Sequence, residues 1–151
     1  MIQKSLKDWI QEYEKGTGNK FECLKDFTLW YLPNRGFCQF TMLPNEKLIF
    51  IRDTCNDAHF WRDTMECLAH QYGYDFLMTL CIRHILPYIR YFGWTIEQKF
   101  TVNGFKRYIC SDQENREIVI TAKYVGVHGE IYYYVTQAMH KQYKKWKTVN
   151  G

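Results

Sequence analysis

The chain has 151 residues, of which 46% are hydrophobic and 18% aromatic, and its formal net charge is +4. This length suits a single domain over residues 1–151, and the apolar and aromatic content excludes an intrinsically disordered chain. No apolar run is long enough to cross a bilayer, and the N-terminal residues lack the apolar core of a signal peptide. We therefore expect no membrane partner and a cytoplasmic location.

The first third of the chain predicts a helix followed by strands. Ser5–Glu14 has apolar residues at helical spacing, and Ser5 is placed to cap that helix. The apolar residues between Phe21 and Phe27 suggest one further helical turn. Three short apolar segments separated by turns then predict an antiparallel meander. These segments are Thr28–Leu32, Phe37–Leu43 and Lys47–Arg52.

The middle of the chain predicts a crossover unit. Asn56 or Asp57 caps a helix that ends at Gly73. The buried face of that helix is expected to hold four residues: Trp61, Met65, Leu68 and Tyr72. The apolar run Asp75–Cys81 predicts a buried strand. Because it follows a helix, we expect it to lie beside Lys47–Arg52 and parallel to it.

A second helix and a group of strands are expected in the rest of the chain. Pro87 fits only a first helical turn, so this helix starts near Leu86 and buries Ile85, Ile89 and Phe92. Asn103-Gly104 is a strong hairpin signal. The expected strands are Trp94–Val102, Phe105–Cys110, Glu117–Tyr124 and Glu130–Val135. From Thr136 the chain is predicted to be helical and basic. The fold class expected is α+β, with a mixed, mostly antiparallel sheet and helices on both faces.

The order of these elements resembles the GCN5-related N-acetyltransferase (GNAT) family from the first helix to Cys110. The local matches are the central strand Leu48-Ile49-Phe50-Ile51-Arg52, the helix end Ala69-His70-Gln71-Tyr72-Gly73-Tyr74 and the segment Tyr91-Phe92-Gly93-Trp94. The resemblance implies an N-acyltransferase that binds acetyl-CoA and passes the acetyl group to an amine on a small molecule or protein.

The resemblance also implies roles for individual residues. Backbone amides of Ile51 and Asp53 would hold the pantetheine and the thioester oxygen. The cofactor-binding residues expected are Ile51, Arg52, Asp53, Asn56 and Arg83. Tyr88 or Tyr91 would protonate the leaving thiolate. The groups able to remove a proton from the acceptor amine are Glu46, Asp53, Glu97 and His84.

The loop expected to bind the coenzyme A pyrophosphate gives a second hypothesis. This loop, Arg52-Asp53-Thr54-Cys55-Asn56-Asp57, has no glycine and carries two carboxylates. A carboxylate at a helix N-terminus competes with phosphate for the same amides. The alternative is therefore a catalytically silent, GNAT-like binding protein with a nucleic acid or protein partner, of the kind that a phage or mobile element carries.

Three other patterns have two readings each. Arg52, Arg83 and Arg90 either bind an anion in a cleft or pair with nearby aspartates. Tyr132-Tyr133-Tyr134 either stacks nucleic-acid bases beside the basic tail or packs as a strand. Cysteine and histidine pairs, such as Cys55 with His59, contain zinc-ligand types but lack zinc-finger spacing. We expect no metal site and six reduced cysteines, mostly buried.

Overall fold

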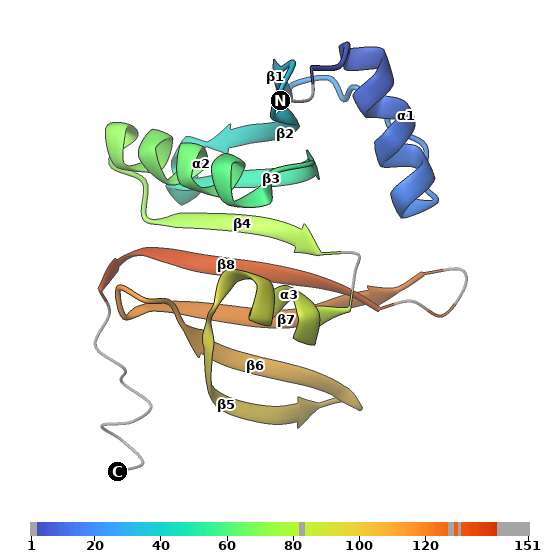
Figure 1. Cartoon of the computed structure of the whole chain (residues 1–151). Coiled ribbons are helices and arrows are strands. Elements are labelled where there is room, and N and C mark those ends of the chain that lie inside the picture. Colours follow the sequence, from blue (N-terminus) through green and yellow to red (C-terminus); the bar gives the residue numbers. More distant parts are fainter. Residues whose placement is uncertain (1–2, 82–83, 127–128, 130, 142–151) are drawn as a thin grey trace. The chain divides into compact units, whose positions relative to one another are not determined.

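The computed structural model describes residues 3–81, 84–126, 129 and 131–141. The chain divides into two compact units, Met1–Tyr74 and Asp75–Gly151. Helices and strands occur in both units, and every strand pair inside either unit is antiparallel. The predicted α+β class with mostly antiparallel strands is confirmed (Figure 1). The prediction that residues 1–151 form a single domain depends on how the two units pack together, and it stays a prediction.

The first unit is the predicted meander with a helix before and after it. Its strands pair in the order β1-β2-β3, and β1 is bonded to β2 alone among the described strands of this unit. A bulge between Gln39 and Phe40 interrupts the register of β2 on β3. The elements are α1 (Leu6–Thr17), β1 (Thr28–Leu32), β2 (Gly36–Leu43), the short 3-10 helix η1 (Pro44–Glu46), β3 (Leu48–Cys55) and α2 (Ala58–Tyr72).

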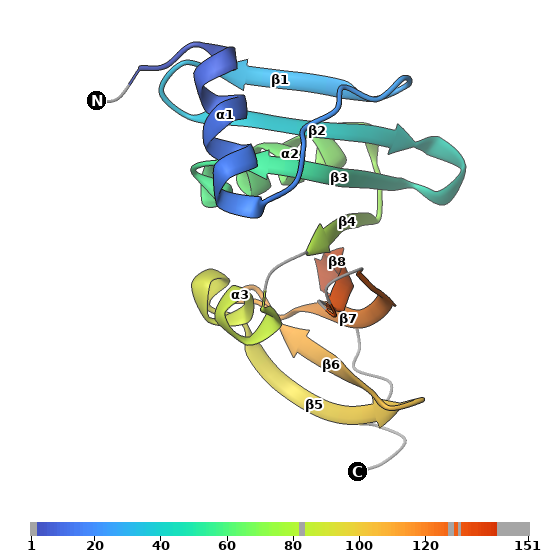
Figure 2. The same cartoon turned by 90° about the vertical axis from the view of Figure 1, so that its right-hand side faces the viewer.

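The two helices of this unit cover opposite faces of the meander (Figure 2). On one face, Trp9 of α1 packs with Phe21, Phe37 and Cys55 in a buried cluster. On the other face, Trp61 and Met65 of α2 are buried. Side chains alternate between the faces of a strand, so neighbouring residues of β1 are directed to different helices. Helices on both faces were predicted, and within this unit that is confirmed.

The N-cap residues predicted for α1 and α2 are confirmed. The Ser5 hydroxyl accepts a hydrogen bond from the Asp8 amide at 3.1 Å, and the Asp57 carboxylate accepts one from the Phe60 amide at 3.4 Å. Gly73 ends α2 with a φ of 68°, a left-handed conformation in which glycine carries no Cβ penalty. The expected burial of Tyr72 is wrong, because its side chain is 61% exposed at the last turn.

The described residues of the second unit form one helix and five strands. Its strands pair in the order β4-β8-β7-β6-β5. The hairpin between β5 and β6 is confirmed, with Asn103 and Gly104 both at positive φ. The elements are β4 (Phe76–Cys81), α3 (Ile85–Phe92), β5 (Thr95–Val102), β6 (Phe105–Ser111), β7 (Arg116–Val125) and β8 (Ile131–Lys141).

Helix α3 covers one face of this sheet, as both views show (Figures 1 and 2). Its apolar side chains Ile85, Ile89 and Phe92 are buried, as predicted. The strands beneath it bury alternate side chains. These are Leu77, Tyr108, Cys110, Ile118, Ile120, Tyr133 and Val135. The core of the second unit therefore lies between α3 and one sheet face.

Two sequence predictions of helix are wrong. Thr136 to Lys141 continues strand β8, because β4 and β7 on its two sides pair with its backbone. The segment from Phe21 to Phe27 is irregular, because side chains take its amides: Glu14 accepts from the Phe21 amide at 2.8 Å and Gln39 from the Leu24 amide at 2.9 Å. The basic tail after Lys141 lies outside the described residues.

The predicted parallel pairing of Lys47–Arg52 with Asp75–Cys81 would join one unit to the other. It stays a prediction. Both segments are strands, with β3 starting one residue later than expected and running on to Cys55. Strand β4 is less buried than expected, because only Leu77 and Cys81 among its residues are buried.

Replacing Gly36 with alanine should destabilise the first unit. A Cβ at this position would lie 1.9 Å from the Cys55 carbonyl oxygen, and the φ of 95° is strained for any other residue. We expect Gly36→Ala to lower the free energy of unfolding by more than about 2 kcal/mol. Urea unfolding followed by tryptophan fluorescence measures it.

Gly16→Ala is the matched control. Gly16 lies in α1 and a Cβ there meets nothing within 4 Å. This variant should be unchanged or more stable by about 0.5 kcal/mol, since alanine favours helix over glycine. Equal effects of the two substitutions would contradict the close approach of Gly36 to the Cys55 carbonyl.

Candidate functional site

The residues predicted to bind coenzyme A lie mostly in a strand. The sequence placed a loop at Arg52 to Asp57, but β3 continues to Cys55 and leaves a turn of only Asn56 and Asp57. Ile51 is buried opposite Phe40 of β2, and Arg52 is half-exposed. The loop prediction is therefore wrong in its extent, because the polar residues of this segment are satisfied within the sheet.

The carboxylate of Asp53 lies inside this strand because hydrogen bonds and an ion pair satisfy it. Its side chain is 6% exposed and accepts hydrogen bonds from the Tyr13 hydroxyl and the Gln39 amide, each at 2.6 Å. Arg52 Nη1 lies 3.1 Å from the same carboxylate. Burial, and then the hydrogen bond to Asp53, raise the pKa of Tyr13. Asp53 is thus a structural anion, and this agrees with the reading in which Arg52 pairs with an aspartate.

The start of α2 is occupied by groups of the chain itself. Asn56 and Asp57 both have positive φ, and the Asp57 carboxylate caps the helix. The Arg35 guanidinium forms an ion pair with Asp57, and the Asn56 side-chain amide donates a hydrogen bond to the Arg35 carbonyl at 3.3 Å. The amides that would hold a pyrophosphate in a GNAT-like enzyme therefore already face a carboxylate.

The predicted catalytic residues lie in different units. Glu46 is exposed in η1, at the start of β3, so the eight residues of β3 separate it from Asn56 by about 26 Å. Tyr88 and Tyr91 belong to α3 in the second unit. Tyr88 is half-buried with its ring 5.7 Å from that of Trp94, and Tyr91 is exposed. Arg83 lies outside the described residues.

The six cysteines lie on different segments of the chain. All six are free thiols, and the buried ones are Cys38, Cys55, Cys81 and Cys110. Cys55 donates to the Trp9 carbonyl at 3.4 Å, whereas its possible partner His59 is exposed. Over the described part of the chain, no group of three or more potential ligands is arranged to hold a metal ion.

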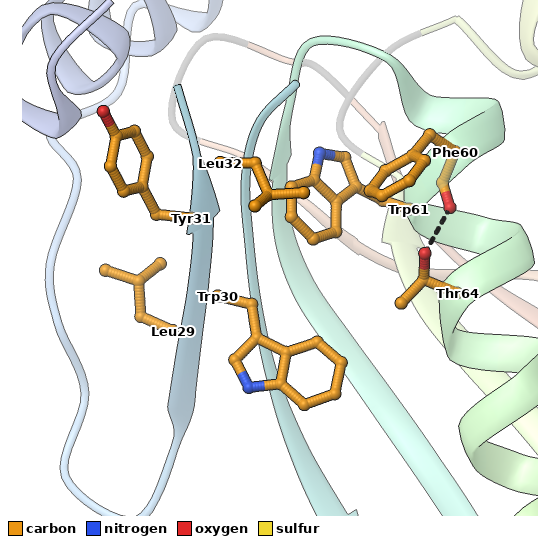
Figure 3. A pocket seen from close by; sticks show the side chains of 7 residues that line it. All are labelled: Leu29, Trp30, Tyr31, Leu32, Phe60, Trp61 and Thr64. Atoms are coloured by element: carbon orange, nitrogen blue, oxygen red, sulfur yellow. Dashed lines mark hydrogen bonds between the residues drawn. The ribbon is translucent and has the colours of Figure 1, made fainter. Parts of the chain in front are cut away.

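An apolar groove of about 480 Å³ lies in the first unit between strand β1 and helix α2 (Figure 3). Trp30 and Leu32 gather on the side of α2, while Leu29 and Tyr31 point the other way. The α2 wall consists of Phe60, Trp61 and Thr64.

The backbone of β1 itself borders this groove. Four consecutive residues, Leu29 to Leu32, line it although their side chains alternate between two faces. Strand β1 stands at the edge of the meander, so its outer backbone groups are unpaired within the described part of this unit. It carries no charged residue, no proline and no bulge, the features that usually protect an edge strand.

Arg35 fixes one wall of the groove. Its guanidinium lies over the Phe60 ring, 4.6 Å from the centroid, and its carbonyl accepts from the Trp61 indole at 3.0 Å. Because Arg35 also pairs with Asp57, both aromatic side chains are held before any ligand arrives. The sequence analysis missed this site. The sequence did contain one signal for it, the uncharged and aromatic strand β1. The wall formed by α2 can be recognised only in the tertiary structure.

No protein-family model, curated protein or solved structure matches this chain. The kinship with GNAT enzymes therefore stays an expectation from the sequence. Among the described helices, none has the length and apolar character needed to cross a membrane.

Stability should fall at alkaline pH because the folded state holds buried protons tightly. Burial raises the pKa of the thiols of Cys38 and Cys110 to about 12, against a usual value of 9.0. Below pH 9.0 both states keep these protons, so stability does not change. Between that pH and about 12 the unfolded chain releases them first, so the free energy of unfolding decreases.

Urea unfolding at pH values from 8 to 11 measures this decrease, and Cys38→Ala is the diagnostic variant. Each such thiol contributes a slope of up to about 1.4 kcal/mol per pH unit. The variant should show a shallower alkaline slope. An unchanged slope would mean that Cys38 is accessible to solvent in the folded state.

Proposed function

We propose that this chain is a binding protein that accepts an extended segment of a partner polypeptide along β1. The observation that carries the proposal is the outer edge of β1, which pairs with no described strand of the first unit and borders an apolar groove. An added strand would form main-chain hydrogen bonds with β1 and direct alternate side chains toward α2. This is the protein-partner form of the second hypothesis from the sequence.

The chemistry of the groove favours apolar side chains. Trp30 and Leu32 are 37% and 41% exposed, so a ligand that covers them gains hydrophobic free energy. The two side-chain hydroxyls of the lining are already engaged: the Thr64 hydroxyl donates to the Phe60 carbonyl at 2.8 Å, and the Tyr31 hydroxyl donates to the Lys4 carbonyl. Among the described residues, no carboxylate, histidine or thiol lines the groove, which supports binding over catalysis.

A synthetic peptide of alternating leucine and threonine is the first probe. We expect its binding to be weakened at least about ten-fold by Leu32→Asp, because the new carboxylate would lie against the leucine side chains that the added strand directs toward α2. Isothermal titration calorimetry with the full chain measures the affinity. The same peptide with proline at alternate positions should not bind, since proline cannot donate to β1.

Leu86→Asp is the matched control, because Leu86 on α3 is 44% exposed and lies in the second unit. This variant should bind the peptide as the wild type does. If both variants lost binding equally, or if the proline peptide bound as well as its parent, strand addition to β1 would be excluded.

An acetyl-CoA-dependent N-acetyltransferase is the second candidate, supported by the order of elements. A meander, a helix, a strand, a helix and a hairpin follow one another as the GNAT resemblance implies. The amine acceptor and the cytoplasmic location remain parts of this hypothesis.

Thermal unfolding with millimolar acetyl-CoA tests the second candidate. We expect no rise in the midpoint, because Asp57 and its partner Arg35 occupy the start of α2. A rise that depends on acetyl-CoA concentration, and that Asp57→Asn increases, would support the enzyme over the binding protein.

A further inference from the structure

The sheet of the second unit has one face that no described element of this unit covers. Residues that pair directly across antiparallel strands share a face. The register places one row of half-exposed or exposed side chains across all five strands, opposite the side chains buried under α3. This row, which we call the open face, consists of Leu80, Tyr134, Thr121, Arg107 and Phe100.

Cations on the open face are held by aromatic rings. The Arg107 guanidinium lies 5.7 Å from the centroid of Phe100, and the Lys123 ammonium lies 5.4 Å from that of Tyr134. Neither cation has an ion pair with any described residue. The Arg107 Nε is, in addition, a buried donor that lacks a hydrogen-bond partner among the described atoms. Neither of these two cations is therefore neutralised by an ion pair, although the register places the Glu117 carboxylate on the same face of β7.

The spacing of the aromatic rings suits separate bases rather than one flat ligand. Tyr132 and Tyr134 are two residues apart on β8, so their Cα atoms lie about 6.6 Å apart on the same face. Phe100 lies three strands away from Tyr134, about 14 Å across the sheet. Base–aromatic stacking needs exposed ring faces, and neighbouring cations neutralise the phosphates between them.

We propose that the open face binds single-stranded nucleic acid. The bases stack on Tyr134, Tyr132 and Phe100, and the backbone phosphates pair with Arg107 and Lys123. Two cations without ion pairs favour a polyanion, and the aromatic rings on the strands to either side of them favour one with bases over an acidic polypeptide. This site is separate from the groove of the first unit, so either proposal can fail alone.

Fluorescence anisotropy of a labelled oligothymidylate of about 15 nucleotides, titrated with the full chain, tests the proposal. Tyr134→Ala should weaken binding by about five-fold or more. Lys123→Gln should weaken it and lower the salt slope by about one. Thr121→Glu, an exposed position in the centre of the row, should abolish binding.

Tyr91→Ala and Lys99→Gln are the controls, because both residues are exposed and Lys99 pairs with Tyr108 on the α3 side of the sheet. Both should bind as the wild type does. Circular dichroism establishes whether each variant is folded. If Tyr134→Ala does not fold, Thr121→Glu replaces it as the open-face variant. The proposal is overturned if the wild type does not bind at low salt, if the controls lose as much affinity as the open-face variants, or if labelled polyglutamate binds equally well.

Discussion

The first unit depends on one buried carboxylate. The Asp53 carboxylate accepts hydrogen bonds from the Tyr13 hydroxyl, the Gln39 side-chain amide and the Arg52 guanidinium. These three residues belong to α1, β2 and β3. A buried charge is tolerated only when it is paired and hydrogen-bonded, so these three elements must be in place together. Gln39 extends the network, because its amide also donates to the Glu22 carbonyl and accepts from the Leu24 amide. The groove is built on a sheet that this network fixes from behind.

The second unit uses a similar device. Asp112 accepts from Arg116 Nε at 2.7 Å and from the Gln137 amide at 3.0 Å, all three side chains being buried. The contact ties the β6–β7 turn to β8 and explains how Gln137 can lie in a predominantly apolar core. In both units the polar core residues have structural partners, so the candidate binding surfaces lie elsewhere. They are an unpaired edge in one unit and an uncovered sheet face in the other.

Local signals in the sequence were sufficient for most of the elements. Ser5, Asp57 and Asn103-Gly104 act through hydrogen bonds and backbone conformations within a few residues, so their caps and turns could be predicted. The errors arose where distant partners decide. Asp53 is typical of a loop by composition, yet Tyr13 and Gln39 stabilise it inside a strand. Thr136 to Lys141 favours helix locally, yet β4 and β7 pair with it.

The candidate sites were harder to predict than the fold. The groove requires Trp30 of β1 and Phe60 of α2 to line the same hollow, and no local pattern encodes the arrangement of these two elements. The sequence did single out Tyr132-Tyr133-Tyr134, and the alternation of β8 separates these residues: Tyr133 is buried, whereas Tyr132 and Tyr134 are half-exposed. The reading in which the motif packs as a strand is therefore confirmed for Tyr133, and base stacking by Tyr132 and Tyr134 stays a proposal.

The uncharged edge of β1 also has a consequence for the protein in concentrated solution. Two copies present identical, unprotected strands, and antiparallel strands with the same sequence can pair with each other about a two-fold axis. A natural ligand on β1 would prevent this self-association by occupying the edge. Purified without such a ligand, the protein has an intrinsic route to dimers and larger aggregates that begins at Thr28–Leu32.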